Sequence, residues 1–510
     1  MAAAPTVAGA AKTPPPASGM TKRIGLAAAI AVLLIIIFMP AIPGLPPSGQ
    51  MMLGILAFAV IVWMTEALEY SVSAIVIGAL IICLLAISPA PGKEAAGVWM
   101  GTKGALPYAL SGFSSSAVVL VAAACFIAAA MTATQLDKRI ALQVLSFVPA
   151  RAKHVAMGAI LVGFLLSFIV PSATARIACL MPIMLGFLSA FGADRRSKFA
   201  ALVVITAAQT GSVWNVGIKT AAAQNMVAIG FIEKELGANI TWGEWFVAGA
   251  PFSAVLTVAL YFIMTRMLKP EMDYIEGGRE AIRQQLTALG PMTANQGKLL
   301  AIVLILLGFW ATEGVLHSVD TTTSTIVAIA VMLLPRVGVM SWKESQKGFP
   351  WGTVLLFAVG ITMGTALLKT EAAPWLAKLI VTHLGLATAS AFAIFMLLSL
   401  FLIVIHLGFA SATGLAATMI PIIISVLKAV ETPGINPIGM TMLLQFVVSF
   451  GFILPVNSPQ GMLAYGTDTF TIQDYVKTGL VLTIVATVLL AVFALTYWPW
   501  MGYMTLKPAG

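Results

Sequence analysis

Charged residues are scarce in this sequence of 510 residues. Asp, Glu, Lys and Arg together make up 9% of it, hydrophobic residues make up 60%, and the mean hydropathy is +1.00. Soluble domains carry roughly a quarter charged residues to cover their surface. A water-soluble protein is therefore excluded, and we expect an integral membrane protein in a lipid bilayer. The net charge of +9 does not indicate nucleic acid, because the basic residues lie in short loops between apolar runs.

Paired cysteines and the motifs of several enzyme classes are also missing. Cys83, Cys125 and Cys179 lie inside apolar stretches without paired spacing, so neither a disulfide framework nor a zinc site is indicated. The sequence has no phosphate-binding glycine loop, no metal-ligand helix and no nucleophile elbow. Acidic residues are nearly absent from the apolar runs, where Glu66 and Glu313 lie near run ends. We therefore predict that the protein is not an enzyme.

Apolar runs of membrane-spanning length follow a tail rich in Ala, Pro, Ser and Thr. We expect residues 1–22 to form a disordered cytoplasmic tail and the run at 24–42 to be an uncleaved first helix. The runs at 156–190 and 390–428 cover about 35 and 39 residues, where roughly 20 suffice to cross a bilayer. Small hydroxyl residues interrupt both runs, which predicts re-entrant helical hairpins. The expected fold is all-α integral membrane, with about eleven transmembrane helices plus two re-entrant hairpins.

The two interruptions repeat each other. Residues 171–174 read Pro-Ser-Ala-Thr and residues 410–413 read Ala-Ser-Ala-Thr, at an offset of 411 − 172 = 239, and Pro-Ile follows each Thr eight residues later. Paired units with interrupted helices are typical of the inverted repeats of secondary transporters. The chain is expected to divide into the tail at 1–22, N-terminal scaffold helices at 23–112, a first repeat at 113–265, a crossover segment with scaffold helices at 266–349, a second repeat at 350–500 and a C-terminal tail at 501–510.

The distribution of basic residues predicts the orientation of the chain. With a cytoplasmic N-terminus and two re-entrant hairpins, most loop Lys and Arg residues between Lys138 and Lys347 fall on the inside. The outside keeps few, chiefly Lys93, Lys103, Lys234, Lys369, Lys378 and Lys428. This asymmetry predicts a multi-pass protein of the inner (plasma) membrane with an external C-terminus.

Polar groups at the two interruptions are the first candidates for a binding site. Unwound backbone within a bilayer is tolerated only where it is buried in protein or lines a cavity. Ser172, Thr174, Ser411 and Thr413 offer hydroxyls there, and the half-helices that begin beside them direct free N–H groups and a positive dipole end at the same region. Two such helix ends suit a dianion. The alternative is that the hydroxyls only bond to helical carbonyls.

Two cations lie in or beside these apolar runs. Arg176 comes two residues after Thr174, and Lys219 follows the next apolar run, where small and amide residues predict another unwound stretch. A cation at the centre of a membrane helix costs about 2.5–3.5 kcal/mol and needs a reason to be there. Either one or both cations neutralise an anionic ligand, or Arg176 snorkels or caps a carbonyl and Lys219 reaches the outer water. The matching stretch 455–461 carries no charge, so we expect an asymmetric site, and His406 is expected to be packed or hydrogen-bonded rather than to relay protons.

These motifs resemble the divalent anion/sodium symporter family, which includes bacterial dicarboxylate symporters and citrate/succinate-type antiporters. The resemblance covers most of the chain after the tail and lies in the two hydroxyl motifs with their Pro-Ile, in the segment 350–357 and in the stretch from Asn457 to Gly466. It implies a homodimer whose protomers each have a scaffold domain and a moving transport domain, working by an elevator motion. The substrate-binding residues that the motifs and the resemblance indicate are Ser172, Ala173, Thr174, Arg176, Lys219, Thr220, Ser411, Ala412, Thr413, Asn457, Ser458 and Pro459.

Departures from the family pattern bear on the coupling ion. Members usually have Ser-Asn-Thr at both hairpin tips, whereas this chain has Ala173 and Ala412 at the Asn positions. Each difference removes an amide oxygen of the kind that a hard cation needs. Sodium is therefore an alternative only, as a weak site near Ser172, Gly217, Ser411 and Asn457, and no other cofactor is indicated.

The predicted function is a secondary active transporter of organic di- or tricarboxylates that exchanges one anion for another by an elevator mechanism. The string Pro-Ser-Ala-Thr-Ala-Arg at 171–176 looks like the antiporter branch of the family. By that resemblance, Arg176, with or without Lys219, would supply permanently the charge that sodium supplies elsewhere. A sodium-coupled or proton-coupled dicarboxylate symporter is the alternative, and an anion channel, which needs a continuous pore, is a third interpretation. The expected partners are a small organic dianion or trianion, the bilayer and a second copy of the chain.

Overall fold

Helices make up the regular structure of this chain. The computed structural model describes residues 19–149, 151–190, 194–271, 278–347 and 349–506. Within these residues the regular elements are all helical, and β pairing is limited to three isolated bridges. Ten helices in the described ranges are long and apolar enough to cross a bilayer. The predicted all-α membrane fold is confirmed. The number of eleven crossings stays a prediction, because those ten include hairpin helices and leave out shorter apolar ones.

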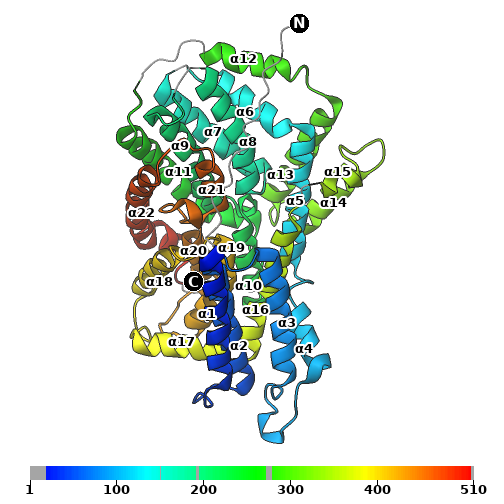
Figure 1. Cartoon of the computed structure of the whole chain (residues 1–510), viewed down its shortest axis with the longest axis vertical. Coiled ribbons are helices and arrows are strands. Elements are labelled where there is room, and N and C mark those ends of the chain that lie inside the picture. The colour runs from blue at the N-terminus through cyan, green and yellow to red at the C-terminus, as the bar shows by residue number, and fades with distance from the viewer. Residues whose placement is uncertain (1–18, 150, 191–193, 272–277, 348, 507–510) are drawn as a thin grey trace.

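The N-terminal helices form a block at the lower end of the molecule in Figure 1. Helix α1 packs along α2, and α3 packs against both α2 and α4. Helix α1 begins at Gly19, so the last four residues of the predicted tail at 1–22 are helical and that part of the prediction is wrong. The last proline before the helix is Pro16, so no proline within residues 19–22 prevents a helix there. The rest of that tail lies outside the described residues. The bounds are α1 Gly19–Phe38, α2 Pro47–Thr65, α3 Tyr70–Ala86, the 3-10 helix η1 Glu94–Ala96 and α4 Gly101–Leu110.

One order of elements occurs twice after this block: a long helix, a short helix, a hairpin of two helices, a broken helix and a second long helix. The first series is α5 Ser116–Thr134, α6 Leu136–Ser146, α7 Ala152–Ile169, α8 Ala173–Ala190, α9 Lys198–Gly217, η2 Lys219–Ala221, α10 Ala223–Leu236 and α11 Trp242–Met267. The second is α16 Trp351–Lys369, α17 Ala372–His383, α18 Ala391–His406, α19 Ala412–Ala429, α20 Pro437–Val448, η3 Pro455–Asn457, α21 Pro459–Tyr465 and α22 Ile472–Leu495.

The corner between the long and the short helix is built in the same way in both series. Gln135, between α5 and α6, and Glu371, between α16 and α17, both adopt the left-handed backbone conformation, with φ of 56° and 62°. A left-handed residue is uncommon outside glycine and ends a helix sharply. The short helices that follow lie far apart along the long axis of the molecule, with α6 in the upper part of Figure 1 and α17 at the bottom.

Four helices connect the two series, and one more follows the second. They are α12 Gly278–Ala288, α13 Ala294–Thr312, α14 Thr321–Leu333, α15 Trp342–Gln346 and, after α22, α23 Tyr497–Met501. Helix α12 covers the upper end of the molecule beside α6 (Figure 1). The chain beyond α23 docks on the start of α20, where the backbone N–H of Asn436 donates to the carbonyl of Met504.

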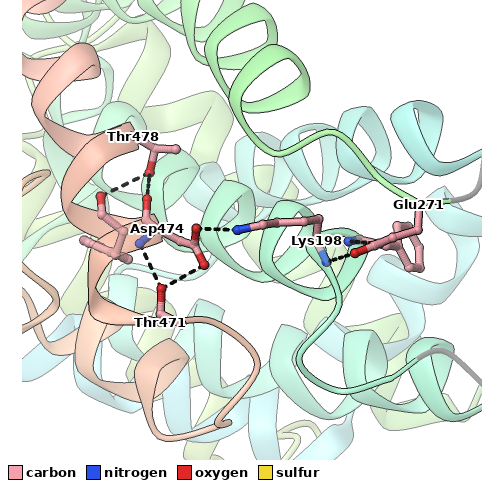
Figure 2. A network of polar contacts seen from close by, with 7 residues as sticks. Lys198, Glu271, Thr471, Asp474 and Thr478 are labelled. Atoms are coloured by element: carbon pink, nitrogen blue, oxygen red, sulfur yellow. Dashed lines mark hydrogen bonds and ion pairs between the residues drawn. The ribbon is translucent and has the colours of Figure 1, made fainter.

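Polar contacts at the start of α9 tie three helix ends together (Figure 2). The Lys198 ammonium donates to Asp474, which lies in the first turn of α22, at 2.6 Å. The backbone N–H groups of Lys198 and Phe199 donate to the carboxylate of Glu271, four residues beyond α11, at 2.6 and 3.2 Å. Since a helix begins with N–H groups that lack partners inside the helix, this carboxylate completes the N-terminus of α9. The network also joins the first series to the second.

Candidate anion-binding site

The first hairpin is broken at its tip, as the sequence predicts. Helix α7 ends at Ile169, Val170 is extended with φ −107° and ψ 101°, and α8 begins at Ala173. The Ser172 hydroxyl accepts a hydrogen bond from the backbone N–H of Ala175 at 3.2 Å. Ser172 therefore caps the new helix, which is the usual use of serine at a helix start.

The second hairpin repeats this geometry. Helix α18 ends at His406 and α19 begins at Ala412, with Ser411 extended at φ −142° and ψ 116°. The Ser411 hydroxyl accepts from the backbone N–H of Gly414 at 3.3 Å. At both tips the serine hydroxyl thus caps the N-terminus of the second helix. Thr174 and Thr413 differ, because over the described residues their hydroxyls have no hydrogen-bond partner within the protein.

A helix in each series is also broken close to these tips. The 3-10 helix η2 separates α9 from α10, which confirms the unwound stretch predicted around Lys219. In the second series η3 separates α20 from α21, and the Ser458 hydroxyl caps α21 by accepting from the N–H of Gly461 at 3.1 Å. Pro459 follows at the first position of that helix, where its missing N–H is not needed.

One cavity of about 700 Å³ brings the four breaks together. Ten of the predicted substrate-binding residues line it, and they come from both series. These are Ser172, Ala173, Thr174, Thr220, Ser411, Ala412, Thr413, Asn457, Ser458 and Pro459. The N-termini of α8 and α19 lie at the wall of this cavity. Their positive dipole ends and the hydroxyls of Thr174 and Thr413 therefore face the same cavity.

Arg176 does not line this cavity. It is 1% exposed, and its guanidinium lies behind the wall, where it donates to the carbonyls of Val170 and Ala221 at 2.9 Å each and to the Asn215 side-chain oxygen at 2.7 Å. A longer bond of 3.4 Å reaches the carbonyl of Gly211. The five N–H donors of a guanidinium suit the carbonyls that two helix breaks leave without helical partners. Carbonyl capping, one of the two roles predicted for Arg176, is therefore seen, and direct contact with a substrate stays a prediction.

Lys219 and Gly217 also lie outside the cavity lining. The Lys219 ammonium donates to the carbonyl of Ile240 at 2.6 Å. It lines a smaller cavity of about 350 Å³ together with Glu233 and Asp320. Lys219 therefore faces a separate space with acidic neighbours.

Neutral side chains do for the second break what Arg176 does for the first. The amide nitrogen of Asn457 donates to the carbonyls of His406, Phe409 and Leu407, at 2.8, 3.1 and 3.4 Å. The His406 ring lines the cavity, and its Nε2 lies 3.3 Å from the carbonyl of Asn457. In the first series Asn225 also donates to backbone carbonyls at the break.

These contacts occupy several of the oxygens that a weak sodium site at the breaks would use. Sodium needs several oxygen ligands, much as other hard cations do. The carbonyls at the breaks already accept N–H groups from Arg176, Asn225 and Asn457, and Ala173 and Ala412 supply no side-chain oxygen. Across the described ranges no group of three or more His, Cys, Asp and Glu residues is placed to hold a metal ion.

Sequence reasoning did not select two glutamines that line the cavity, Gln224 and Gln460. They occupy matching positions, since each is the second residue of the half-helix after a break, in α10 and in α21. Their offset, 460 − 224 = 236, is close to that of the hairpin tips. That offset is the signal that could have identified them.

Comparisons with known proteins show what the chain is similar to. The family described as "Sodium:sulfate symporter transmembrane region" matches residues 20–504. A "Membrane protein" of Cupriavidus necator is 51% identical, over 96% of this chain and 95% of its own length. A "Citrate/succinate antiporter" of Escherichia coli K12 is 26% identical over 93% and 97%, and a "Sodium-dependent dicarboxylate transporter" of Staphylococcus saprophyticus is 22% identical over 91% and 89%.

Proposed function

The chain belongs to the sodium:sulfate symporter transmembrane family, and on that premise we propose that it carries organic di- or tricarboxylates by exchanging one anion for another. The family is one of membrane transporters, which confirms the resemblance and the prediction that the chain is not an enzyme. Relatives named for citrate, succinate and dicarboxylates support organic anions as the substrate class.

The buried guanidinium behind the cavity wall is the observation on which this proposal depends. Arg176 is bonded to backbone carbonyls and to an amide, and the two ion pairs found in the described ranges, Arg196–Asp468 and Lys198–Asp474, do not include it. Its positive charge therefore has no carboxylate partner among the residues that the structure describes. Asn215, which accepts from it, also lines the cavity, so an anion bound there lies close to the charge. Low dielectric surroundings strengthen this attraction.

A covalently attached cation favours exchange over symport. A sodium ion that enters with its substrate also leaves with it, so the empty site can return without net charge. The guanidinium of Arg176 cannot leave, and a return without an anion would move an uncompensated buried charge through the membrane, which is costly. A second anion on the return step removes that cost. Each uptake event is then coupled to release of another anion.

The extent of the cavity lining supports an inward-facing state of the transport cycle. Its lining extends from the hairpin tips to Glu344, Lys347 and Pro350. The loop that contains Lys347 is on the cytoplasmic side by the orientation expected from basic residues. We accordingly assign the structure to an inward-facing state, with a cytoplasmic N-terminus and an external C-terminus. The elevator motion, the division into repeat and scaffold domains at the predicted boundaries, and the homodimer belong to the same proposal.

Exchange in proteoliposomes tests the proposal directly. Purified protein is reconstituted with unlabelled succinate inside, and uptake of labelled citrate and succinate is measured with and without sodium, against protein-free liposomes. We expect uptake to depend on internal dicarboxylate and to be the same with and without sodium. A requirement for a sodium gradient without stimulation by internal dicarboxylate would show instead that the chain is a sodium-coupled symporter, as its staphylococcal relative is named.

A further inference from the structure

Two glutamines on the cavity wall are absent from the function proposed so far. Gln224 and Gln460 are 7% and 5% exposed, and both line the cavity. The amide nitrogen of Gln224 donates to the Ser449 hydroxyl at 3.2 Å, and that of Gln460 donates to the Ser212 hydroxyl at 3.0 Å. Each glutamine therefore binds a serine of the other series.

The pairing is reciprocal. Ser212 and Ser449 are separated by 449 − 212 = 237 residues and the glutamines by 236, so the two bonds are related by the same internal repeat. The half-helices follow the same rule, because α10 packs against α19 and α20, whereas α21 packs against α8 and α9. The glutamines consequently lie on the seam between the two series. The hairpin tips, by contrast, are held by their own series, through Arg176 in one and Asn457 in the other.

This placement divides the work of recognising a two-ended ligand. The two hairpin tips, with their helix N-termini and free threonine hydroxyls, suit the two carboxylates. The seam between them then faces the carbon chain that joins the carboxylates. A seam lined by aliphatic side chains would suit an unsubstituted chain, but here it presents two amides.

The free atom of each amide indicates what the chain carries. Serine holds the nitrogen, and within the described part of the protein neither amide oxygen has a hydrogen-bond donor. An ionised carboxylate cannot donate to such an oxygen, whereas a hydroxyl can, and a hydroxyl also accepts from an amide that turns over. A site built to bond a hydroxyl strongly rejects the analogue without it, because its own polar group is left unpaired.

We propose that Gln224 and Gln460 select organic dianions that carry a hydroxyl group between their carboxylates over acids of the same length without one. This proposal rests on the proposed transport of dicarboxylates and names a narrower substrate class for it. Malate and succinate are suitable probes, because both have four carbons and differ by one hydroxyl.

The test is the ratio of malate to succinate exchange in proteoliposomes, measured as kcat/KM for each acid. We expect the unmodified protein to prefer malate by about tenfold or more, which is the size of the effect of one hydrogen bond. Gln224→Met and Gln460→Met should each lower that ratio severalfold, and the double variant should bring it close to one while succinate exchange persists. Loss of a purely structural tie would lower both rates together and leave the ratio unchanged.

Three further variants separate recognition from folding. Gln209→Met is the matched control, since Gln209 is a buried glutamine of α9 that donates to the carbonyl of Phe452 and does not line the cavity. Its ratio should equal that of the unmodified protein. Ser212→Ala and Ser449→Ala keep both glutamines but release them, and should lower the ratio less than the Met variants. If the double variant does not fold, the malate-to-succinate ratios of Ser212→Ala and Ser449→Ala decide whether the glutamines select the substrate.

The outcomes distinguish selection by the glutamines from the proposed exchange of dicarboxylates. Equal rates for malate and succinate in the unmodified protein, or a preference that survives in the Met variants, overturn the role of the glutamines and leave dicarboxylate exchange standing. Failure of the unmodified protein to exchange any dicarboxylate overturns the proposed function and the selectivity with it.

Discussion

The two hairpin breaks have the same backbone and different chemistry. At both tips a serine caps the second helix, and a threonine hydroxyl has no hydrogen-bond partner among the described residues. Behind the first tip the carbonyls are bonded by the charged guanidinium of Arg176, whereas behind the second they are bonded by the neutral amide of Asn457. Unpaired carbonyls in a membrane must be satisfied in either case. The repeat thus requires a donor at each break but leaves the charge of that donor open, and here the charged donor stands behind the first tip.

Replacing Arg176 should cause the largest loss of exchange among the variants that compare the two hairpin tips. Arg176→Met removes the charge and leaves the carbonyls of Val170 and Ala221 without this donor. Buried acceptors left without a partner and a lost charge-assisted bond each cost roughly 1–3 kcal/mol, so we expect dicarboxylate exchange to fall by more than about 100-fold. Initial rates of exchange in proteoliposomes measure the effect.

Two further variants show whether charge or hydrogen bonding is responsible. Arg176→Lys keeps the charge but not the planar set of donors and should recover part of the activity. Asn457→Ala, the neutral counterpart, should lower exchange by only about tenfold, since it removes hydrogen bonds without a charge. Equal losses for Arg176→Met and Asn457→Ala would mean that the charge contributes nothing, and the argument for exchange would fail.

The backbone of both breaks could be predicted from the sequence because length alone demands it. A run of about 35 or more apolar residues cannot cross once, and the Ser and Thr residues of both tips are poor helix formers where the run must turn. The repeated Pro-Ile then fixed the equivalence of residues 171–174 and 410–413. Local chemistry and repetition were sufficient for this part.

The direction of the side chains could not be predicted in the same way. Arg176 bonds Ala221, which is 45 residues away, and Gln460 bonds Ser212, which is 248 residues away. Only the packing of whole helices brings these partners together, and a break rotates the helix that follows it by an amount that no local pattern records. For that reason the sequence leaves substrate contact and other partners open for Arg176 and Lys219, and only the folded structure places Gln224 and Gln460 on the cavity wall.

The threonines and serines of the tips sharpen the comparison at the next level of effect. Thr174→Val and Thr413→Val keep the shape of the side chain but remove a hydroxyl that has no partner within the described protein. A hydrogen bond to a charged ligand contributes roughly 1.5–3 kcal/mol, so exchange should fall by about ten- to 100-fold in each variant. Thermal unfolding should stay unchanged.

The serine variants should show the opposite pattern. Ser172→Ala and Ser411→Ala remove helix caps, which lowers stability by about 0.5–2 kcal/mol, and should change exchange less than the threonine variants do. Exchange rates and melting temperatures of the four proteins measure both effects. Normal transport in both valine variants would remove the threonine hydroxyls from the site.

The smallest effect lies outside the membrane, at Glu271 (Figure 2). Partial desolvation raises the pKa of this carboxyl, but hydrogen bonds from the backbone N–H groups of Lys198 and Phe199 outweigh it and lower the pKa below its ordinary value. A carboxyl whose pKa is lowered by folding stabilises the protein at pH above its ordinary value, and that contribution is lost as the pH falls through the lowered pKa.

Glu271→Gln should therefore reduce the stability of the start of α9 by about 0.3–1 kcal/mol at neutral pH, the size of a charge at a helix N-terminus. The melting temperatures of this variant and the unmodified protein should converge as the pH falls below the lowered pKa. Glu431→Gln, at an exposed carboxylate, is the control and should match the unmodified protein at every pH. Transport should change little, because Glu271 supports the N-terminus of α9, whereas the C-terminal end of α9 reaches the cavity. A difference that persists in acid would show that Glu271 acts through its shape and hydrogen bonds rather than through its charge, unlike Arg176, where the charge itself is proposed to matter.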